Sequence, residues 1–209
     1  MRYPKDQKST TRAKILESAS SALRKKGMAG VSIADLMTAA GLTHGAFYNH
    51  FESRESLIDA CIGDAMRETR DRFDIMMGVA EPPVALEVIV NGYLSPRHRD
   101  EPEAGCPIPS LGADIARAST SARGAFSREL VEIVDLIAGQ YDDLPKCAAQ
   151  QKATAFMATI VGTILLARAA DSKQLSERIL EAGRHAVLDS VGTAAKRKGG
   201  VSRHQRVSR

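Results

Sequence analysis

The sequence is poor in aromatic residues and contains no tryptophan. Only nine of its 209 residues are Phe or Tyr, and three of these, Phe47, Tyr48 and Phe51, fall within five positions. Cysteine is also sparse, because the three thiols, Cys61, Cys106 and Cys147, lie far apart and form no CxxC pair. This spacing favours free thiols in a reducing compartment over a disulfide framework.

Long apolar runs are absent too. The first residues, MRYPKDQKSTTRAK, lack the apolar core of a signal peptide. The longest uncharged run, residues 153–167, has 15 residues, and a helix needs about 20 to span a bilayer. We therefore expect a cytoplasmic protein that makes no contact with a membrane.

The basic and acidic residues are unevenly distributed. Residues 1–54 carry nine basic and four acidic residues, residues 55–192 carry fourteen and twenty-one, and residues 193–209 carry six basic residues and no acid. A basic start and end around an acidic middle suggest that a polyanion such as nucleic acid binds at the ends. The alternative is an ordinary solvated surface followed by a disordered basic tail.

Helical spacing and helix-capping residues recur along the chain, whereas strand patterns are almost missing. We therefore predict an all-α fold with a polar loop at 95–105 and a tail from 193. The predicted helices cover residues 11–26, 32–40, 43–51, a longer helix from 53, 82–94, 109–118, 121–141, 145–169 and 172–191.

Two of these helices, 32–40 and 43–51, are short and are joined by a tight turn at Gly41. Such a helix-turn-helix places its second helix in the DNA major groove. Phe47 and Phe51 are four residues apart and should point inward. Gly45 removes a side chain where the helix must lie close to DNA.

Polar side chains around the second helix are suited to DNA contacts. Thr43, His44 and Asn49 can bond to bases or phosphates, and the Tyr48 hydroxyl suits a phosphate. Arg54 lies in the first turn of the next helix, where the helix dipole disfavours a cation unless an anion is bound. The alternative for Arg54 is a surface arginine of no special role.

These residues together resemble the DNA-binding domain of the TetR family of bacterial regulators over roughly residues 9–60. Two positions depart mildly from the family pattern: Leu23 stands where phenylalanine is common, and Leu42 matches as an apolar residue but replaces a frequent valine. The matching positions are Ile15, Leu16, Ala19, Gly27, Ser32, Ile33, Ala40, Gly41, Leu42, Gly45, Tyr48, His50, Phe51, Ser53 and Leu57.

The resemblance implies a homodimeric regulator, expected to be a repressor, that binds a palindromic double-stranded DNA operator and is released by an effector. It implies a three-helix DNA-binding domain at 1–54, an effector-binding and dimerisation bundle at 55–192, and a basic disordered tail at 193–209. It assigns phosphate contacts to Ser32, Tyr48 and Arg54. It assigns base contacts to Thr43, His44, Gly45 and Asn49, and places His50 on the same DNA-reading helix.

The effector site is the least defined part of the prediction. Cys106 can be a buried apolar residue, a redox or electrophile sensor near a helix N-terminus, or a contact to an effector. Metal binding is the least favoured, because His98 and Cys106 lack suitably spaced partners. Candidate pocket residues, for each of which ordinary core packing is the alternative, are Phe73, Met77, Tyr93, Phe126 and Met157.

Dimerisation is predicted for the last two helices, where small residues would let the backbones of four helices approach closely. The candidate interface residues are Ile160, Ile164, Leu175, Ile179 and Ala186.

Two other function classes compete with an effector-controlled regulator. An enzyme would need a clustered Ser/His/Asp set, a glycine-rich phosphate loop or a metal motif, and the sequence offers none, so we expect no catalysis and no cofactor. A constitutive or architectural DNA-binding protein would use the same fold without an effector. The basic tail could then add nonspecific, salt-sensitive affinity for DNA.

Overall fold

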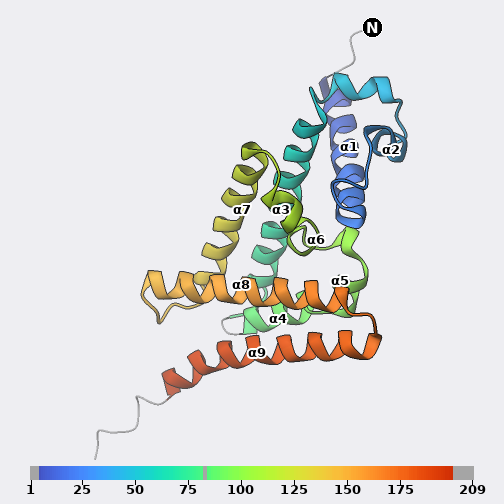
Figure 1. Cartoon of the computed structure of the whole chain (residues 1–209). Coiled ribbons are helices and arrows are strands. Elements are labelled where there is room, and N and C mark those ends of the chain that lie inside the picture. The colour runs from blue at the N-terminus through green and yellow to red at the C-terminus, as the bar shows by residue number, and fades with distance from the viewer. Residues whose placement is uncertain (1–4, 82–83, 200–209) are drawn as a thin grey trace, which may run out of the picture. The chain divides into compact units, whose positions relative to one another are not determined.

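The computed structural model describes residues 5–81 and 84–199, and every regular element in that part of the chain is a helix (Figure 1). The predicted all-α fold is confirmed. The elements are α1 (Lys5–Lys26), α2 (Ile33–Ala39), the 3-10 helix η1 (His44–Asn49), α3 (Arg54–Met77), α4 (Val84–Tyr93), α5 (Pro96–Asp100), the 3-10 helix η2 (Pro102–Ala104), α6 (Ile108–Ala116), α7 (Thr120–Ala138), α8 (Lys146–Ala169) and α9 (Lys173–Gly199).

The helices form two compact units, which differ from the division expected at residue 54. Unit 1 comprises Met1–Asp71 and Asp100–Glu132, and unit 2 comprises Arg72–Arg99 and Ile133–Arg209. The difference arises because α3 is one continuous helix, and because η2 and α6 pack on α1. The expected boundary at residue 54 between a DNA-binding and an effector-binding domain stays a prediction.

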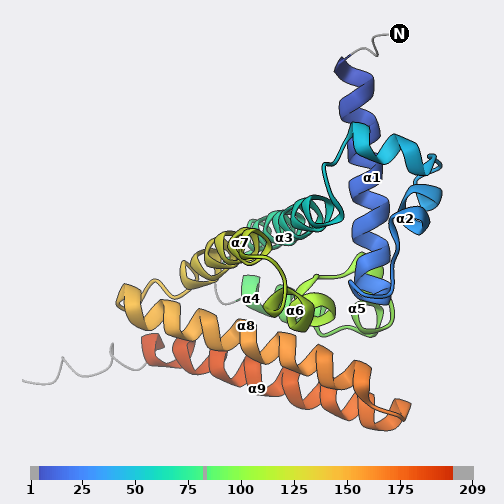
Figure 2. The same ribbon diagram turned by 45° about the horizontal axis from the view of Figure 1, so that its top comes forward.

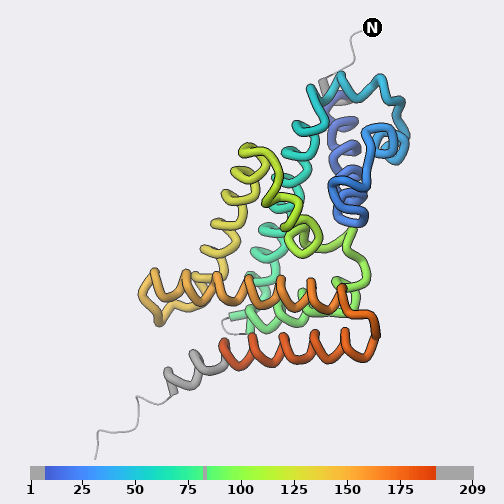
Figure 3. The backbone as a smooth tube through the Cα atoms, viewed as in Figure 1, coloured from blue at the N-terminus to red at the C-terminus, as the bar shows by residue number. Residues whose placement is uncertain are grey.

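The glycines and the serine predicted to bound α1 and α2 have the expected geometry. Gly27 ends α1 with a φ of 74°, and Gly41 follows α2 with a φ of 71°, both in the left-handed region that glycine adopts without a steric penalty. Ser32 caps α2, and its hydroxyl accepts the Asp35 N–H at 3.1 Å. Figure 3 follows this path from α1 through η1 into α3.

Three predictions about the extent of the helices were clearly wrong. α1 begins at Lys5 rather than at residue 11. The expected polar loop 95–105 contains α5 and η2, because Pro96 and Pro102 each fix a helical φ at the start of a turn. α9 continues through 193–199 to Gly199, so this part of the expected tail is helical. The rest of the tail, 200–209, lies outside the described residues.

Unit 2 is built on α8 and α9, which lie side by side and run in opposite directions (Figures 1 and 2). Three arginines attach the segment between α4 and η2 to this pair. Arg184 donates to the Leu94 carbonyl at 2.9 Å, and Arg168 donates to the His98 carbonyl at 2.6 Å. Arg99 in turn donates to the Ser176 hydroxyl at 3.1 Å.

By length and composition, α8 is the one helix among the described residues that could cross a membrane. Its packing gives a simpler explanation of its apolar character. Phe156, Met157 and Ile160 are buried within the chain, as expected of a core helix. A single helix of this kind is weak evidence for a membrane span.

The close approach of α8 to α9 depends on Gly183. A Cβ built at Gly183 would lie 2.8 Å from Thr163 Cβ and closer still to Thr163 Oγ1. We expect Gly183→Ala to lower the free energy of unfolding by about 1–3 kcal/mol, because overpacking forces the helices apart. Chemical denaturation followed by circular dichroism would measure this change.

Gly112→Ala is the matched control, because nothing lies within 4 Å of a Cβ at Gly112 in α6. It should be neutral or slightly stabilising. Adding Thr163→Ala to Gly183→Ala should restore part of the loss. Equal effects of the two glycine substitutions would show that close packing at Gly183 is unimportant.

Candidate nucleic-acid interface

The predicted recognition helix exists, but as a 3-10 helix. The sequence predicts an α-helix over 43–51, whereas η1 spans only His44–Asn49. Thr43 is its N-cap, as expected, but the Thr43 side chain makes no capping hydrogen bond. Since 3-10 helices of this length have poor hydrogen-bond geometry, the conformation of η1 must depend on packing.

Two phenylalanines provide that packing. Phe47 is 0% exposed and Phe51 is 4% exposed, and their rings stack with centroids 5.8 Å apart. Tyr48 points the other way and is 62% exposed, with its ring edge-on to Phe47 at 5.2 Å. η1 therefore has one buried aromatic face and one exposed polar face.

The exposed face carries the side chains predicted to contact DNA. Thr43, His44, Gly45, Tyr48 and Asn49 are all exposed. A Cβ at Gly45 would meet nothing within 4 Å, so packing inside the protein does not require glycine there. Close approach to DNA at Gly45 stays a prediction, as do the other DNA contacts.

His50 differs from this group because it is half-buried at the end of η1. Burial lowers the pKa of His50, and the positive charges of Lys8 and Arg12 lower it further. Its Nδ1 atom is buried and has no hydrogen-bond partner within the described part of the chain. His50 is therefore a partly buried imidazole beside two cations rather than an exposed base reader.

Ser32, predicted to contact phosphate, uses its polar groups within the protein. Its hydroxyl donates to Asp35 Oδ2 at 2.6 Å, and its backbone N–H donates to the same oxygen at 3.1 Å. These bonds lower the pKa of the Asp35 carboxyl. A phosphate at Ser32 would have to compete with this capping box.

Arg54 also has an internal role that the sequence did not reveal. Its Nη2 donates to the carbonyl of Met28 and, at 3.2 Å, to that of Val31. The backbone N–H of Met28 donates to Asp114 Oδ2 at 2.9 Å. Met28, between α1 and α2, is thus held on one side by α3 and on the other by α6.

The same residues border an open groove of about 390 Å³ within unit 1, lined in part by Met28, Arg54, Asp59, Asp114 and Ser119. Most of the polar groups around it are paired. Ser119 donates to Asp59 at 3.0 Å, and Arg117 donates to Asp114 at 3.0 Å. The groove is therefore bordered by a polar network that connects α3, α6 and the start of α7.

The end of α1 is tied to the segment before α6 by basic side chains. Arg24 is buried, donates to the Gly105 carbonyl at 3.3 Å and lies 3.8 Å from a Glu68 oxygen. Lys25 pairs with Glu103 at 3.2 Å. The sequence alone gives no sign that two members of the run RKK at 24–26 join distant segments.

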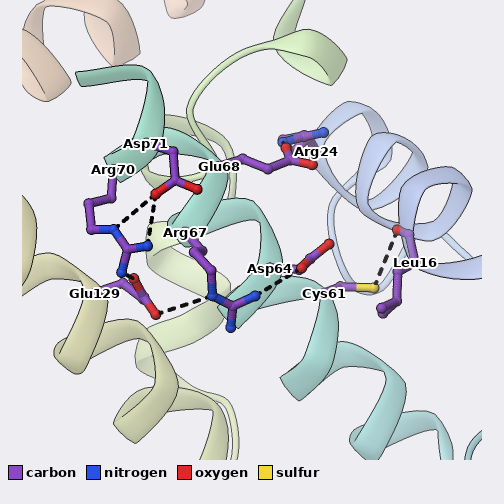
Figure 4. Close-up of polar contacts among 9 residues, drawn as sticks. All are labelled: Leu16, Arg24, Cys61, Asp64, Arg67, Glu68, Arg70, Asp71 and Glu129. Carbon is purple, nitrogen blue, oxygen red and sulfur yellow. Dashed lines mark hydrogen bonds and ion pairs between the residues drawn. The ribbon is translucent and has the colours of Figure 1, made fainter. Parts of the chain in front are cut away.

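Figure 4 shows how Arg24 and a second group of ion pairs are placed around α3. Arg70 binds Glu129 of α7 at 2.9 Å and Asp71 at 2.8 Å, and Arg67 binds Asp64 at 3.1 Å. The pairs with Asp71 and Asp64 lie within α3, whereas the contacts to Glu129, from Arg70 at 2.9 Å and from Arg67 at 3.8 Å, attach α7 to α3 within unit 1.

The Cys61 thiol, in the same view, points at the Leu16 carbonyl, 3.9 Å away. Burial raises the pKa of Cys61 to about 12. Since the thiolate is the reactive form of cysteine, Cys61 is an inert core thiol.

The predicted effector residues are divided between the two units. Cys106 and Phe126 belong to unit 1, whereas the other four belong to unit 2. Cys106 is buried and Phe126 is half-buried. In unit 2, Phe73 and Tyr93 meet edge to face at 6.0 Å, and the remaining two, Met77 and Met157, are also buried. A common effector pocket for these six residues remains a prediction.

Two predicted dimer-interface residues are misplaced. Ile160 and Ile164 are both 0% exposed within the chain, so neither is available to a second copy. The prediction placed the wrong face of α8 in the interface, because Leu165 and Leu166 are the exposed leucines of this helix. The three other candidates remain, since Leu175 and Ala186 are exposed and Ile179 is half-buried.

Comparison with known proteins identifies the family. The model named "Bacterial regulatory proteins, tetR family" matches residues 15–61, which cover α2, η1 and parts of α1 and α3. The chain is 39% identical over 71 residues to the HTH-type transcriptional regulator TtgR of Pseudomonas putida, covering 34% of this chain and 33% of TtgR. Residues 15–61 therefore match the DNA-binding segment of the TetR family.

A second TetR-family relative is the HTH-type transcriptional repressor KstR2 of Rhodococcus jostii, 26% identical over 84 residues, which are 40% of this chain and 41% of KstR2. The matched segments thus span about a third to two fifths of these curated relatives. Both relatives are transcriptional regulators rather than enzymes, as expected from the sequence.

Solved structures of the TetR family share the fold over most of the chain. Reduced NemR of E. coli superposes with a TM-score of 0.72 at 18% identity, covering 84% of this chain and 96% of NemR. A TetR-family regulator from Legionella pneumophila gives 0.73 at 18% identity, covering 85% and 95%. At these identities the similarity establishes the all-helical fold of both halves.

The contacts of Arg54 yield a stability prediction. Arg54→Ala should lower the free energy of unfolding by about 1–3 kcal/mol, because two backbone carbonyls lose a charged donor. Thermal or urea unfolding would measure the loss. Arg123→Ala, which removes an exposed arginine of α7, should change stability by less than about 0.5 kcal/mol. Indistinguishable effects would contradict the anchoring role of Arg54.

Proposed function

We propose that the protein is a transcriptional regulator, expected to be a repressor, that binds an inverted-repeat DNA operator as a homodimer. The observation that carries this proposal is η1, whose polar face is exposed while Phe47 and Phe51 hold its other face in the core. The match of residues 15–61 to the TetR family and the similarity to the regulator TtgR and the repressor KstR2 support it.

In this proposal η1 lies in the major groove. Thr43, His44 and Asn49 would read base edges, while Gly45 lets the backbone come close. Tyr48 would donate its exposed hydroxyl to a phosphate. Ser32 and Arg54 are weaker candidates for phosphate contacts than the sequence indicated, because both are engaged within the protein.

Dimerisation would use the exposed faces of α8 and α9. On α8 this face carries Leu166 with small residues one to three turns away. On α9 apolar residues recur at helical spacing. The exposed or half-buried residues that form these two stripes are Ala155, Ala158, Gly162, Leu166 and Ala169 on α8, and Leu175, Ile179, Ala182 and Ala186 on α9.

A small-molecule or thiol-reactive effector would control DNA binding from the rest of the chain. Cys106 is one candidate sensor, because the preceding residue, Gly105, receives the hydrogen bond from Arg24 of α1. A change at Cys106 would thus act on a segment tied directly to the first helix. The alternative function is constitutive DNA binding with no effector.

Selection of duplexes from a random or genomic pool at near-physiological salt tests the proposal. Recovery of an inverted repeat, with one dimer bound per site, is the expected result. Recovery of no common motif, with an affinity that decreases as the salt concentration rises, would indicate that the protein binds DNA nonspecifically. Specific binding that no small molecule or oxidant relieves would favour the constitutive alternative.

Two substitutions on η1 should have different effects on the selected operator. Tyr48→Phe should weaken binding to all duplexes alike, because a phosphate contact carries no sequence information. His44→Ala should instead relax the preference at one base position per half-site, at a cost of roughly 1–3 kcal/mol for the preferred base. Binding measured against a panel of single-base operator variants separates the two. A uniform loss for His44→Ala would contradict base reading.

Leu166→Glu should weaken dimerisation, because it places a charge in the proposed apolar stripe. We expect an increase of at least roughly tenfold in the dimer dissociation constant, measured by analytical ultracentrifugation. Val131→Glu is the matched control, since Val131 is 57% exposed and Leu166 is 60% exposed, and Val131 lies on α7. Dimerisation lost in the control but not in Leu166→Glu would move the interface away from α8.

A further inference from the structure

Two cations on the first half of α1 lie beside the candidate DNA-reading helix and have not been assigned a role. Lys8 and Arg12 are four residues apart, so they occupy the same face of α1, and both are exposed. Both precede the segment 15–61 that the family model matches. The family pattern therefore assigns them no role.

Arg12 is fixed next to η1 by an aromatic contact. Its guanidinium lies 4.7 Å from the centroid of Phe51, and the ring of Phe51 stacks on Phe47 within η1. The N-terminal half of α1 passes close to η1 in both views of the fold (Figures 1 and 2). A cation–π contact of this kind orients the guanidinium while it stays open to solvent.

Among the residues that the structure describes, no carboxylate neutralises the charges of Lys8 and Arg12. Besides burial, the charges of Lys8 and Arg12 disfavour the charged form of His50 and lower its pKa. Within the described part of the chain, neither cation forms an ion pair, and Glu52, which follows Phe51, binds neither of them. Two cations one helical turn apart on α1, without a carboxylate partner in the described part of the chain, attract an anion.

We propose that Lys8 and Arg12 form a phosphate-binding site that holds the DNA backbone at the Phe51 end of η1. This inference rests on the proposed function. An element seated in the major groove has a phosphate strand on either side, so cations flanking η1 are placed to meet one of them. The site also offers a phosphate contact, which Arg54 and Ser32, both engaged in internal hydrogen bonds, provide less readily.

Charge removal on α1 tests the site. Lys8→Ala, Arg12→Ala and the double variant would be compared with wild type by fluorescence anisotropy on the selected operator and on a scrambled duplex, over a series of salt concentrations. Each single substitution should weaken binding roughly five- to tenfold at about 0.1 M salt and reduce the slope of log affinity against log salt by about 0.9. Both duplexes should be affected alike, because phosphate carries no sequence information.

Lys14→Ala is the matched control. The substitution removes the same charge from an exposed position of α1. Because Lys14 is two residues after Arg12, it lies on the opposite side of the helix. It should leave the salt slope close to that of the wild type. Arg12→Lys should retain most of the slope, because the charge is preserved.

Unfolding temperatures measured on the same variants separate a DNA contact from a structural role. Arg12→Ala and Lys8→Ala could both show the same slope of log affinity against log salt as Lys14→Ala, with Arg12→Ala also lowering the unfolding temperature. In that case Arg12 only supports Phe51, and the proposed phosphate site is wrong. If wild type selects an inverted repeat and these variants bind it unchanged, the site fails and the proposed function stands. If wild type binds no duplex, both fail.

Discussion

The burial of Phe47 and Phe51 is the interaction on which the candidate interface depends. η1 has only six residues and 3-10 geometry, so it cannot hold its shape alone. Phe47 has no exposed surface, and the Phe51 ring stacks on it, which fixes the phase of η1 and leaves Tyr48 in solvent. The same Phe51 ring positions Arg12. One pair of buried rings therefore determines where the proposed base-reading and phosphate-binding side chains lie.

The charged side chains near this element divide into two groups with different roles. Arg24 and Arg54 are partly or fully buried and donate to backbone carbonyls, which secures the end of α1 and the turn that follows it. Lys8 and Arg12 are exposed and pair with no carboxylate among the described residues. A buried guanidinium without its carbonyl partners costs several kcal/mol, whereas an exposed one costs little and remains available to a ligand. The basic start of the chain therefore serves both folding and, in our proposal, DNA binding.

Local signals in the sequence were sufficient to predict the helices of the matched segment 15–61. They were not sufficient to predict contacts between residues far apart in the sequence. Ser32 and Asp35 form the predicted capping box, and Gly41 turns the chain as expected, because such motifs depend on neighbouring residues only. The partners of Arg54 are 26 and 23 residues away, and Gly105 is 81 residues from Arg24, so no local pattern could reveal them. The prediction for Ile160 and Ile164 failed because α8 is apolar on most of its faces, and only the fold shows which face is covered by its own chain.

Hydroxyl-radical footprinting of the protein on its selected operator tests the central claim most directly. The account predicts two half-sites whose centres lie about 34–36 Å apart along the duplex, each with protected backbone on both sides of the major groove that faces η1. In Arg12→Ala, protection on one side of each half-site should weaken while the other side persists. Protection without a two-fold pattern, or with the minor groove facing the protein, would contradict the placement of η1 and the account built on it.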